Sequence, residues 1–313
     1  MNAFFGALRT AIDAGVIVVL AGMGELLTER VGVLNLGQEG LIGLGAIGAV
    51  VAADRGAGPW VAFLVGMTAA ALFGLLFATS VVVVRTNQVL TGLALVLIGV
   101  GLSNQLGNGF QGSPIQSRFG SFRIPILADI PQLGPALFEH TAIVYLSYIV
   151  LPLVVWFLLF RTRHGMNLRA VGENPAAADA AGISVMGMRL LYTTIGAALS
   201  GAGGAFLMLV LTRGWSVDVA RGRGWVALAV VIFAAWRPSL LVLGALLFGA
   251  MTSLEFVAQR QNWGIPSSLL STLPYIVTLA LIVVPAVLTR FGFKGRSTLA
   301  PGALAEPYFR EER

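Results

Sequence analysis

The stretch GELLTERVGVLNLGQEGLIGLG, residues 24–45, places a polar and glycine-rich insert between two apolar segments. Ionisable side chains within otherwise lipid-like sequence are costly unless they are paired, reached by water or functional. The insert therefore predicts a hinge and packing turn between the two apolar segments. The polar side chains to be explained are Glu25, Glu29, Arg30, Asn35, Gln38 and Glu39.

The composition of the whole chain excludes a soluble protein. The 313 residues are 57% hydrophobic and only 11% charged, whereas a soluble domain carries roughly a quarter charged residues. Apolar runs of about 20 residues recur, which is the length that crosses a bilayer as a helix. The sequence thus predicts an all-α, polytopic helical membrane protein. The predicted segments are residues 11–27, 36–53, 60–84, 89–107, 142–160, 190–211, 225–236, 239–257 and 269–289.

The seventh segment, residues 225–236, is too short to cross a bilayer, because it spans only about 18 Å as a helix. We interpret it as a half-span or re-entrant element hinged at Trp236-Arg237-Pro238. The chain is therefore expected to have about eight or nine transmembrane segments, with broken or re-entrant helices.

Basic residues predict the orientation, because cytoplasmic loops carry an excess of Lys and Arg. Residues 161–189 and the tail after residue 289, with Lys294 and Arg296, are expected in the cytoplasm, and residues 108–141 and the amino terminus outside. Residues 212–224 disagree, since Arg213, Arg221 and Arg223 fall outside by alternation. Either this part is re-entrant or the count of segments slips there. We expect one transmembrane domain, residues 1–296, and a flexible cytoplasmic tail, residues 297–313.

The sixth segment carries small residues at every fourth position, as in Gly196, Ser200 and Gly204. This spacing lets helix backbones approach closely in a membrane. The glycines of the chain are thus expected mainly to pack helices. The alternative is that some of them interrupt helices beside a permeation path.

The loop 161–189 predicts one short helix in the cytoplasm. Asn174 can cap it, Pro175 is tolerated at its first position, and Gly182 ends it. Its small side chains would let the groove of another protein come close. We interpret the loop as a docking surface for a cytosolic partner, with a bare connector as the alternative.

Several polar residues lie within or at the ends of apolar segments. Glu39 opens a helix, where its carboxylate is favoured near the positive helix end or could pair with Arg30. Each of the other polar residues could either cap a helix at the membrane interface or contact the solute. The candidates for a solute path are Asn35, Gln38, Glu39, Asn87, Gln88, Asn104 and Gln105.

Catalytic signatures are missing from the sequence. It contains no GxxxxGK[ST], HExxH or GxSxG motif and no cysteine, and His140 and His164 lack metal-ligand spacing. We therefore expect no catalytic residues, no metal site and no ATP hydrolysis by the chain itself. The net charge of +6 is explained by loops that face anionic lipid, so no nucleic-acid partner is expected.

Five motifs occur in an order that resembles the permease subunits of bacterial ABC importers. They are GELLTERVGVLNLGQEGLIGLGA from residue 24, NQVLTGLALVLIG at 87–99, LRAVGENPAAADAAGISV at 168–185, GRGWVALAVVIFAAWRP at 222–238 and LGALLFGA at 243–250. The resemblance covers about residues 10–290. It is to the branch with branched-chain amino acid, ribose and nucleoside permeases, and within it to the shorter nucleoside-type permease.

The resemblance implies a site and a set of partners. Residues on the family pattern of the coupling helix, which docks onto the ATPase subunit, are Arg169, Glu173, Asn174, Pro175, Ala178 and Gly182. One departure is Ala176, where a basic residue often follows the proline. The implied partners are an ATP-binding cassette ATPase, a second, longer permease and an extracytoplasmic solute-binding lipoprotein, besides membrane lipid.

The resemblance also implies a function in the bacterial inner membrane. The chain would move a nucleoside or a related simple sugar into the cytoplasm by alternating access, with ATP used by the partner ATPase and no cofactor bound by the chain. Alternatives are a permease for branched-chain amino acids, or an ion-coupled secondary transporter with Glu25, Glu39 and Glu255 as the candidate relays. An intramembrane enzyme is disfavoured.

Overall fold

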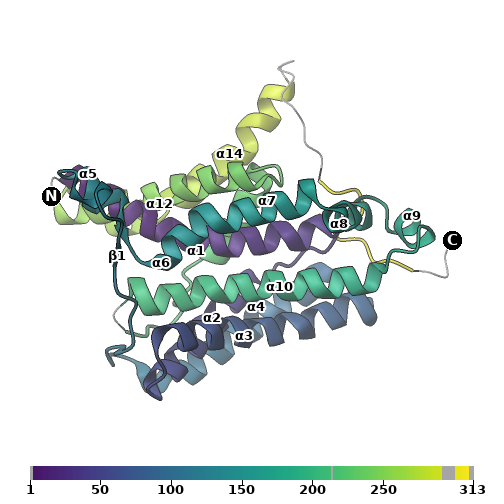
Figure 1. Cartoon of the computed structure of the whole chain (residues 1–313), viewed down its shortest axis with the longest axis horizontal. Helices are drawn as coiled ribbons and strands as arrows, with labels where there is room; N and C mark the ends of the chain where they lie inside the picture. Colours follow the sequence, from purple (N-terminus) through teal and green to yellow (C-terminus); the bar gives the residue numbers. More distant parts are fainter. Residues whose placement is uncertain (1–2, 213, 291–299, 310–313) are drawn as a thin grey trace.

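Long helices run side by side from one end of the molecule to the other, as Figure 1 shows. The computed structural model describes residues 3–212, 214–290 and 300–309. Its α-helices are α1 (Ala3–Arg30), α2 (Gln38–Asp54), α3 (Pro59–Ala78), α4 (Gln88–Gly107), α5 (Leu133–Leu137), α6 (Ala142–Tyr145), α7 (Leu151–Arg161), α8 (Arg163–Glu173), α9 (Pro175–Ala180), α10 (Val185–Phe206), α11 (Arg223–Phe233), α12 (Pro238–Arg260), α13 (Ser267–Leu270) and α14 (Leu273–Arg290).

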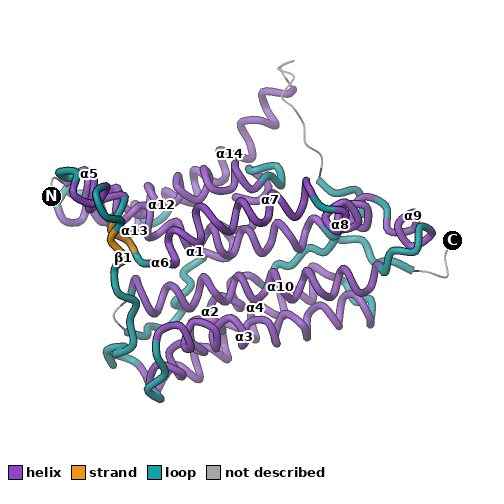
Figure 2. Tube along the Cα trace, in the orientation of Figure 1, coloured by secondary structure: helices purple, strands orange, loops and turns teal. Residues whose placement is uncertain are grey.

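Short helical turns and one small sheet complete the described chain. The π-helical turns η1 (Thr79–Val83), η4 (Leu146–Val150) and η5 (Leu207–Leu211) continue or join long helices, and η2 (Asn108–Phe110) and η3 (Leu127–Asp129) are 3₁₀ turns. The strands β1 (Phe122–Arg123) and β2 (Glu139–His140) pair antiparallel, with Phe122 opposite His140 and Arg123 opposite Glu139 (Figure 2).

Each of the nine apolar segments predicted from the sequence is helical. Within the described residues, six stretches are long and apolar enough to cross a membrane: Phe4–Arg30, Pro59–Val83, Gln88–Phe110, Ala142–Arg161, Val185–Leu211 and Pro238–Arg260. The other three are α2 with 17 residues, α11 with 11 and α14 with 18. The prediction of a polytopic helical protein is confirmed.

The centre of the bundle is packed backbone against backbone. Helix α10 lies against α1, α2 and α3, and α1 also lies along α12. A Cβ atom added at Gly45 would collide with the backbone of Gly201, and one added at Gly204 would collide with the backbone of Ile42. The expectation that glycines pack helices holds at these crossings, where a larger residue has no room.

The first membrane helix is longer than the sequence predicted. Helix α1 continues through Arg30, so the turn before α2 consists of residues 31–37 and not of the whole stretch 24–45. The helix can continue because its buried carboxylates are satisfied inside the protein. Glu25 accepts hydrogen bonds from the backbone N–H of Asn35 (3.0 Å) and from Nε2 of Gln38 (2.5 Å).

The two ends of the bundle differ in content (Figure 1). The amino terminus, β1, β2 and α5 lie at one end, called here the amino-terminal end, and α8, α9 and residues 300–309 lie at the other, called here the α9 end. This arrangement places residues 108–141 and 161–189 at opposite ends, as the alternation of segments requires.

Candidate functional site

Two helices begin inside the bundle and not at its ends. Gly37, just before α2, lies against Leu95 in the middle of α4, and Gln38 lies against Ser200 in α10. Helix α11 begins beside the first turn of α2, and it ends near Trp236, whose Nε1 donates to Glu29 near the end of α1. Interrupted helices with buried ends are typical of solute and ion sites in transporters.

Glu39 joins the two interrupted helices. Its Oε1 accepts a hydrogen bond from the backbone N–H of Gly222 (2.5 Å) and its Oε2 from that of Gly224 (2.8 Å). The half-buried carboxylate thus lies at the positive ends of both α2 and α11, where a negative charge is stabilised. Glu39 is not bonded to Arg30, whose Nη2 donates to the backbone carbonyl of Trp236 (3.0 Å). Of the two expectations for Glu39, the contact with a helix end is the one observed.

Residues 212 and 214–222, called here the re-entrant segment because they turn from the amino-terminal end back into the bundle, account for the conflict in the predicted orientation, since Gly222 and Gly224 beside the two arginines lie inside the bundle at Glu39. The re-entrant segment forms isolated bridges between Trp215 and Gln111 and between Gly214 and Pro114 at the amino-terminal end, and then turns into the bundle towards Glu39. Helix α11 starts there and ends at Phe233, and α12 begins at Pro238. The predicted half-span and its hinge at residues 236–238 are confirmed. Arg213 lies outside the described residues.

Asn104 holds the re-entrant segment at a second point. Its Nδ2 donates to Oδ1 of Asp218 (2.7 Å), and its Oδ1 accepts from the backbone N–H of Asp218 (3.0 Å). The neighbouring Gln105 is exposed on the surface of α4. The re-entrant segment is therefore anchored through polar side chains of α2 and α4.

A cavity of about 440 Å³ lies between the re-entrant segment and helices α1 and α12. This volume is in the range of small-molecule sites. Its polar lining combines hydroxyl groups with guanidinium groups, and Phe256 adds an aromatic ring. The polar lining residues are Thr10, Thr212, Ser216, Arg221, Arg223 and Thr252.

The other predicted path residues hold the turn 31–37 in place. Asn35 and Gln38 are fully buried and both bond to Glu25, and the Ser200 hydroxyl donates to Gln38. Oε1 of the buried Gln88 accepts from the backbone N–H of Leu34 (2.8 Å).

Asn87 caps α4, because its Oδ1 accepts from the N–H of Leu90 (3.0 Å). Asn87 and Gln88 are therefore at one end of α4, and Asn104 and Gln105 at the other. Of the seven predicted path residues, the structure brings Glu39 and Asn104 together at the re-entrant segment.

The predicted coupling loop contains two helices where the sequence predicted one. Helix α9 is the expected one: Oδ1 of Asn174 accepts from the N–H of Ala177 (3.0 Å), Pro175 opens the helix, and Gly182 follows it with a φ of +81°. The unexpected helix, α8, is capped by the hydroxyl of Thr162, which accepts from the N–H of Gly165 (3.0 Å). Its buried residues Gly165, Leu168, Val171 and Gly172 recur at helical spacing, and this amphipathic pattern is the signal in the sequence that could have found it.

The remaining predicted coupling residues lie on both helices. On α8, the Arg169 guanidinium lies over the ring of Phe160 at 5.3 Å, and Oε2 of the exposed Glu173 accepts from the N–H of Gly302 (3.1 Å). On α9, Ala178 is buried, whereas Ala176 and Ala177 are exposed. The exposed face of α9 is therefore made of small side chains.

Residues 300–309 are packed on this loop, whereas the sequence predicted a flexible tail from residue 297. Ala303 is buried, and its N–H donates to the carbonyl of Gly172 (2.9 Å). The other residues of the tail lie outside the described part of the chain. Tail residues show no periodicity, so nothing in the sequence signalled this contact.

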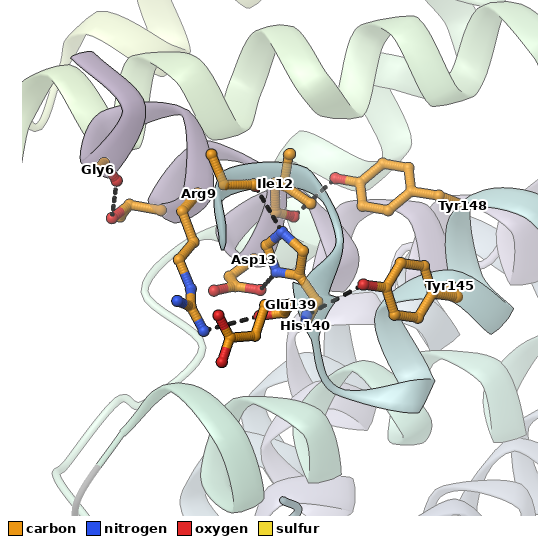
Figure 3. Close-up of polar contacts among 10 residues, drawn as sticks. Gly6, Arg9, Ile12, Asp13, Glu139, His140, Tyr145 and Tyr148 are labelled. Carbon is orange, nitrogen blue, oxygen red and sulfur yellow. Dashed lines mark hydrogen bonds and ion pairs between the residues drawn. The ribbon is translucent and has the colours of Figure 1, made fainter. Parts of the chain in front are cut away.

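A polar cluster closes the amino-terminal end of the bundle (Figure 3). Nδ1 of His140 lies 2.7 Å from Oδ1 of Asp13, Nε2 of His140 lies 2.9 Å from the carbonyl of Ala136, and Tyr148 donates to the carbonyl of Ile12 (2.9 Å). His140 is therefore a buried residue that ties β2 to α1. Within the described residues, no group of three or more His, Asp or Glu side chains is placed to hold a metal ion.

Comparisons with known proteins show a matching family and similar chains. The family model described as the branched-chain amino acid transport system / permease component matches residues 8–288. The nucleoside ABC transporter permease protein NupC of Lactococcus lactis is 35% identical, over 85% of this chain and 87% of its own length.

Two further relatives match almost end to end. The guanosine ABC transporter permease protein NupQ of Bacillus subtilis is 32% identical, over 95% of this chain and 94% of its own. The protein TsgC13 of Haloferax volcanii, named provisionally as a glucose ABC transporter permease, is 34% identical over 98% of both chains.

Proposed function

The chain belongs to the branched-chain amino acid transport system / permease component family, as an ABC importer permease of small polar solutes, and from this premise we propose that its solute is a nucleoside or a simple sugar. The relatives NupC and NupQ are named for nucleosides and TsgC13, provisionally, for glucose. Both kinds of solute are uncharged and rich in hydroxyl groups. The cavity beside the re-entrant segment offers hydroxyls, guanidinium groups and the Phe256 ring to such a molecule.

The observation that carries the proposed path is the meeting of α2 and α11 at Glu39. Small changes in the tilt of either helix would alter the contacts of Glu39 with Gly222 and Gly224, and with them the access to the cavity. In alternating access, one part of the permease shifts against another around a fixed site. We propose that the re-entrant segment, residues 212 and 214–222, is the part of this chain that gates the solute.

The substrate proposal is tested by uptake of labelled solutes. Cells that express the chain with the ATPase, the longer permease and the solute-binding protein of its transport system should take up nucleosides or simple sugars and not leucine. An ATPase partner without hydrolytic activity should abolish the uptake. Uptake of branched-chain amino acids alone would contradict the proposal, and uptake by this chain without the ATPase would favour an ion-coupled carrier.

We also propose that α9 docks onto the ATPase, which places the α9 end and residues 300–309 in the cytoplasm. Arg169, Glu173, Asn174, Pro175, Ala178 and Gly182 shape or adjoin this surface. The support is the exposed, small-residue face of a short helix whose start is fixed by the Asn174 cap. A six-residue helix is not stable by itself, so its cap and its neighbours must hold it.

Replacing Asn174-Pro175 by Ala-Ala removes the cap and the pre-formed first turn, which costs about 1 kcal/mol for the cap alone. We expect at least a fivefold loss of the ATPase that co-purifies with the permease. Pro59→Ala is the matched control, since Pro59 also opens a helix but lies at the amino-terminal end. Unchanged co-purification and uptake in the double variant would show that the loop is only a connector.

A further inference from the structure

A cavity of about 380 Å³ lies between one side of α9 and the membrane helices. Its walls are the end of η1, the start of α10 and Asp179 of α9, and Tyr308 lines it from the carboxyl-terminal segment. One side chain of α9, Ala178, packs into the apolar core below. The cavity leaves α9 room to shift relative to the start of α10.

The segment 300–309 crosses from α8 to α10 and α9. Backbone N–H groups of Gly302 and Ala303 donate to Glu173 Oε2 (3.1 Å) and to the carbonyl of Gly172 (2.9 Å), both in α8. The carbonyl of Glu306 then accepts from Nη1 of Arg189 in α10 (2.9 Å). In this way one short segment is bonded to two helices on either side of α9.

The last described contact of the segment is with α9 itself. The hydroxyl of Tyr308 donates to Oδ2 of Asp179 (2.9 Å). Leu304 and Tyr308 also pack against the apolar core that contains Ala178 and Val185. Tyr308 thus bridges the cavity between the packed core and α9.

The buried side chain of Arg189 in α10 depends on the segment 300–309 for a hydrogen-bond acceptor. The side chain is only 2% exposed, and its Nε and Nη2 atoms have no hydrogen-bond partner in the described structure. A buried guanidinium requires acceptors, and the carbonyl of Glu306 is the one the structure gives it. The position of residue 306 is therefore coupled to the first turns of α10.

We propose that residues 300–309 are a strap that positions α9 and transmits its displacement to α10. Tyr308 is the positioning residue towards α9, and Glu306, through its backbone, is the link to Arg189. The proposal rests on the proposed function of α9 as the surface that docks the ATPase. Without the strap, the ATPase would still bind. Helix α9 would then shift into the cavity and displace the membrane helices less.

The test uses Tyr308→Phe, which removes only the hydroxyl, in the complete transporter. We expect normal co-purification of the ATPase, but about a threefold to tenfold fall in solute taken up per ATP hydrolysed, the factor that corresponds to one lost hydrogen bond. Tyr145→Phe is the matched control, because its hydroxyl accepts from His140 at the opposite end of the bundle. An unchanged ratio in Tyr308→Phe would overturn the strap.

A double-mutant cycle keeps the test specific. If Tyr308 acts through Asp179, Tyr308→Phe should change the uptake per ATP no further in a chain that already carries Asp179→Ala. Additive effects of the two substitutions, or a fall in uptake that only follows a loss of assembled complex, would also overturn the proposal. The separate proposal that α9 docks the ATPase would be contradicted by a different result, namely normal ATPase co-purification in the Asn174-Pro175 variant.

Discussion

The centre of the bundle and the re-entrant segment differ in the contacts that hold them. Helices α1, α2, α3 and α10 contact each other through glycine backbones, with no room for a single added methyl group at Gly45 or Gly204. The re-entrant segment packs Trp215, Val219 and Ala220 in the apolar core, but its turn into the bundle is held by polar side chains, with Glu39 at one point and Asn104 at another. Close-packed interiors do not deform gradually, whereas a few hydrogen bonds can exchange. This difference supports the proposal that the re-entrant segment is the part of the permease that moves.

The largest effect is expected where the packed centre is forced apart. Gly45→Val would place its side chain in the backbone of Gly201, and overpacking of this kind costs about 1–3 kcal/mol or more. We expect little monodisperse protein in detergent and a strongly lowered thermal midpoint for what remains. Gly101→Val is the control, because a Cβ atom at Gly101 meets nothing within 4 Å. Equal stability of the two variants would remove the distinction between the regions.

A smaller effect, on transport and not on folding, is expected at Glu39. Glu39→Gln keeps an oxygen for one of the two N–H groups but loses the charge at the helix ends, and hydrogen bonds to charged groups contribute about 1.5–3 kcal/mol. We expect at least a tenfold loss of uptake with unchanged protein yield. Asp54→Asn is the control, since Asp54 is exposed at the other end of the same helix, α2. A loss of yield without a change in uptake per molecule would assign Glu39 to the packed centre.

The smallest effect is expected at the second anchor. Asn104→Ala removes both hydrogen bonds to Asp218, but the pair is exposed, so water replaces much of what is lost. We expect about a twofold to threefold change in uptake and no change in thermal midpoint. Asn108→Ala, on the exposed turn after α4, is the comparison variant. An effect of Asn104→Ala as large as that of Glu39→Gln would mean that both anchors act as one unit.

The sequence predicts those parts of the molecule that depend on local pattern. Apolar length located the membrane helices, and the Asn174-Pro175 cap and the short segment 225–236 located α9 and the half-span α11. These features are encoded by neighbouring residues, which is why they could be read from one chain.

Contacts between distant segments could not be read in this way. Asp218 meets Asn104, Trp236 meets Glu29 and Tyr308 meets Asp179 only because the helices are folded together. The length of α1 was underestimated for the same reason, since its buried carboxylates looked unpaired until the turn 31–37 supplied their partners. The assignment of particular residues to solute or ATPase contact stays a prediction.

The charged side chains around α2 and α11 raise the question of how the transport step responds to membrane voltage. Arg223 interacts electrostatically with the carboxylates of Glu39 and Glu255 and with the neighbouring Arg221, so positive and negative side chains are mixed at this site. A charge that crosses the membrane potential gains or loses about 2.3 kcal/mol per 100 mV, but an uncharged solute carries no charge across. We therefore expect the solute-transfer step to be insensitive to voltage, which leaves nucleotide hydrolysis as its source of direction.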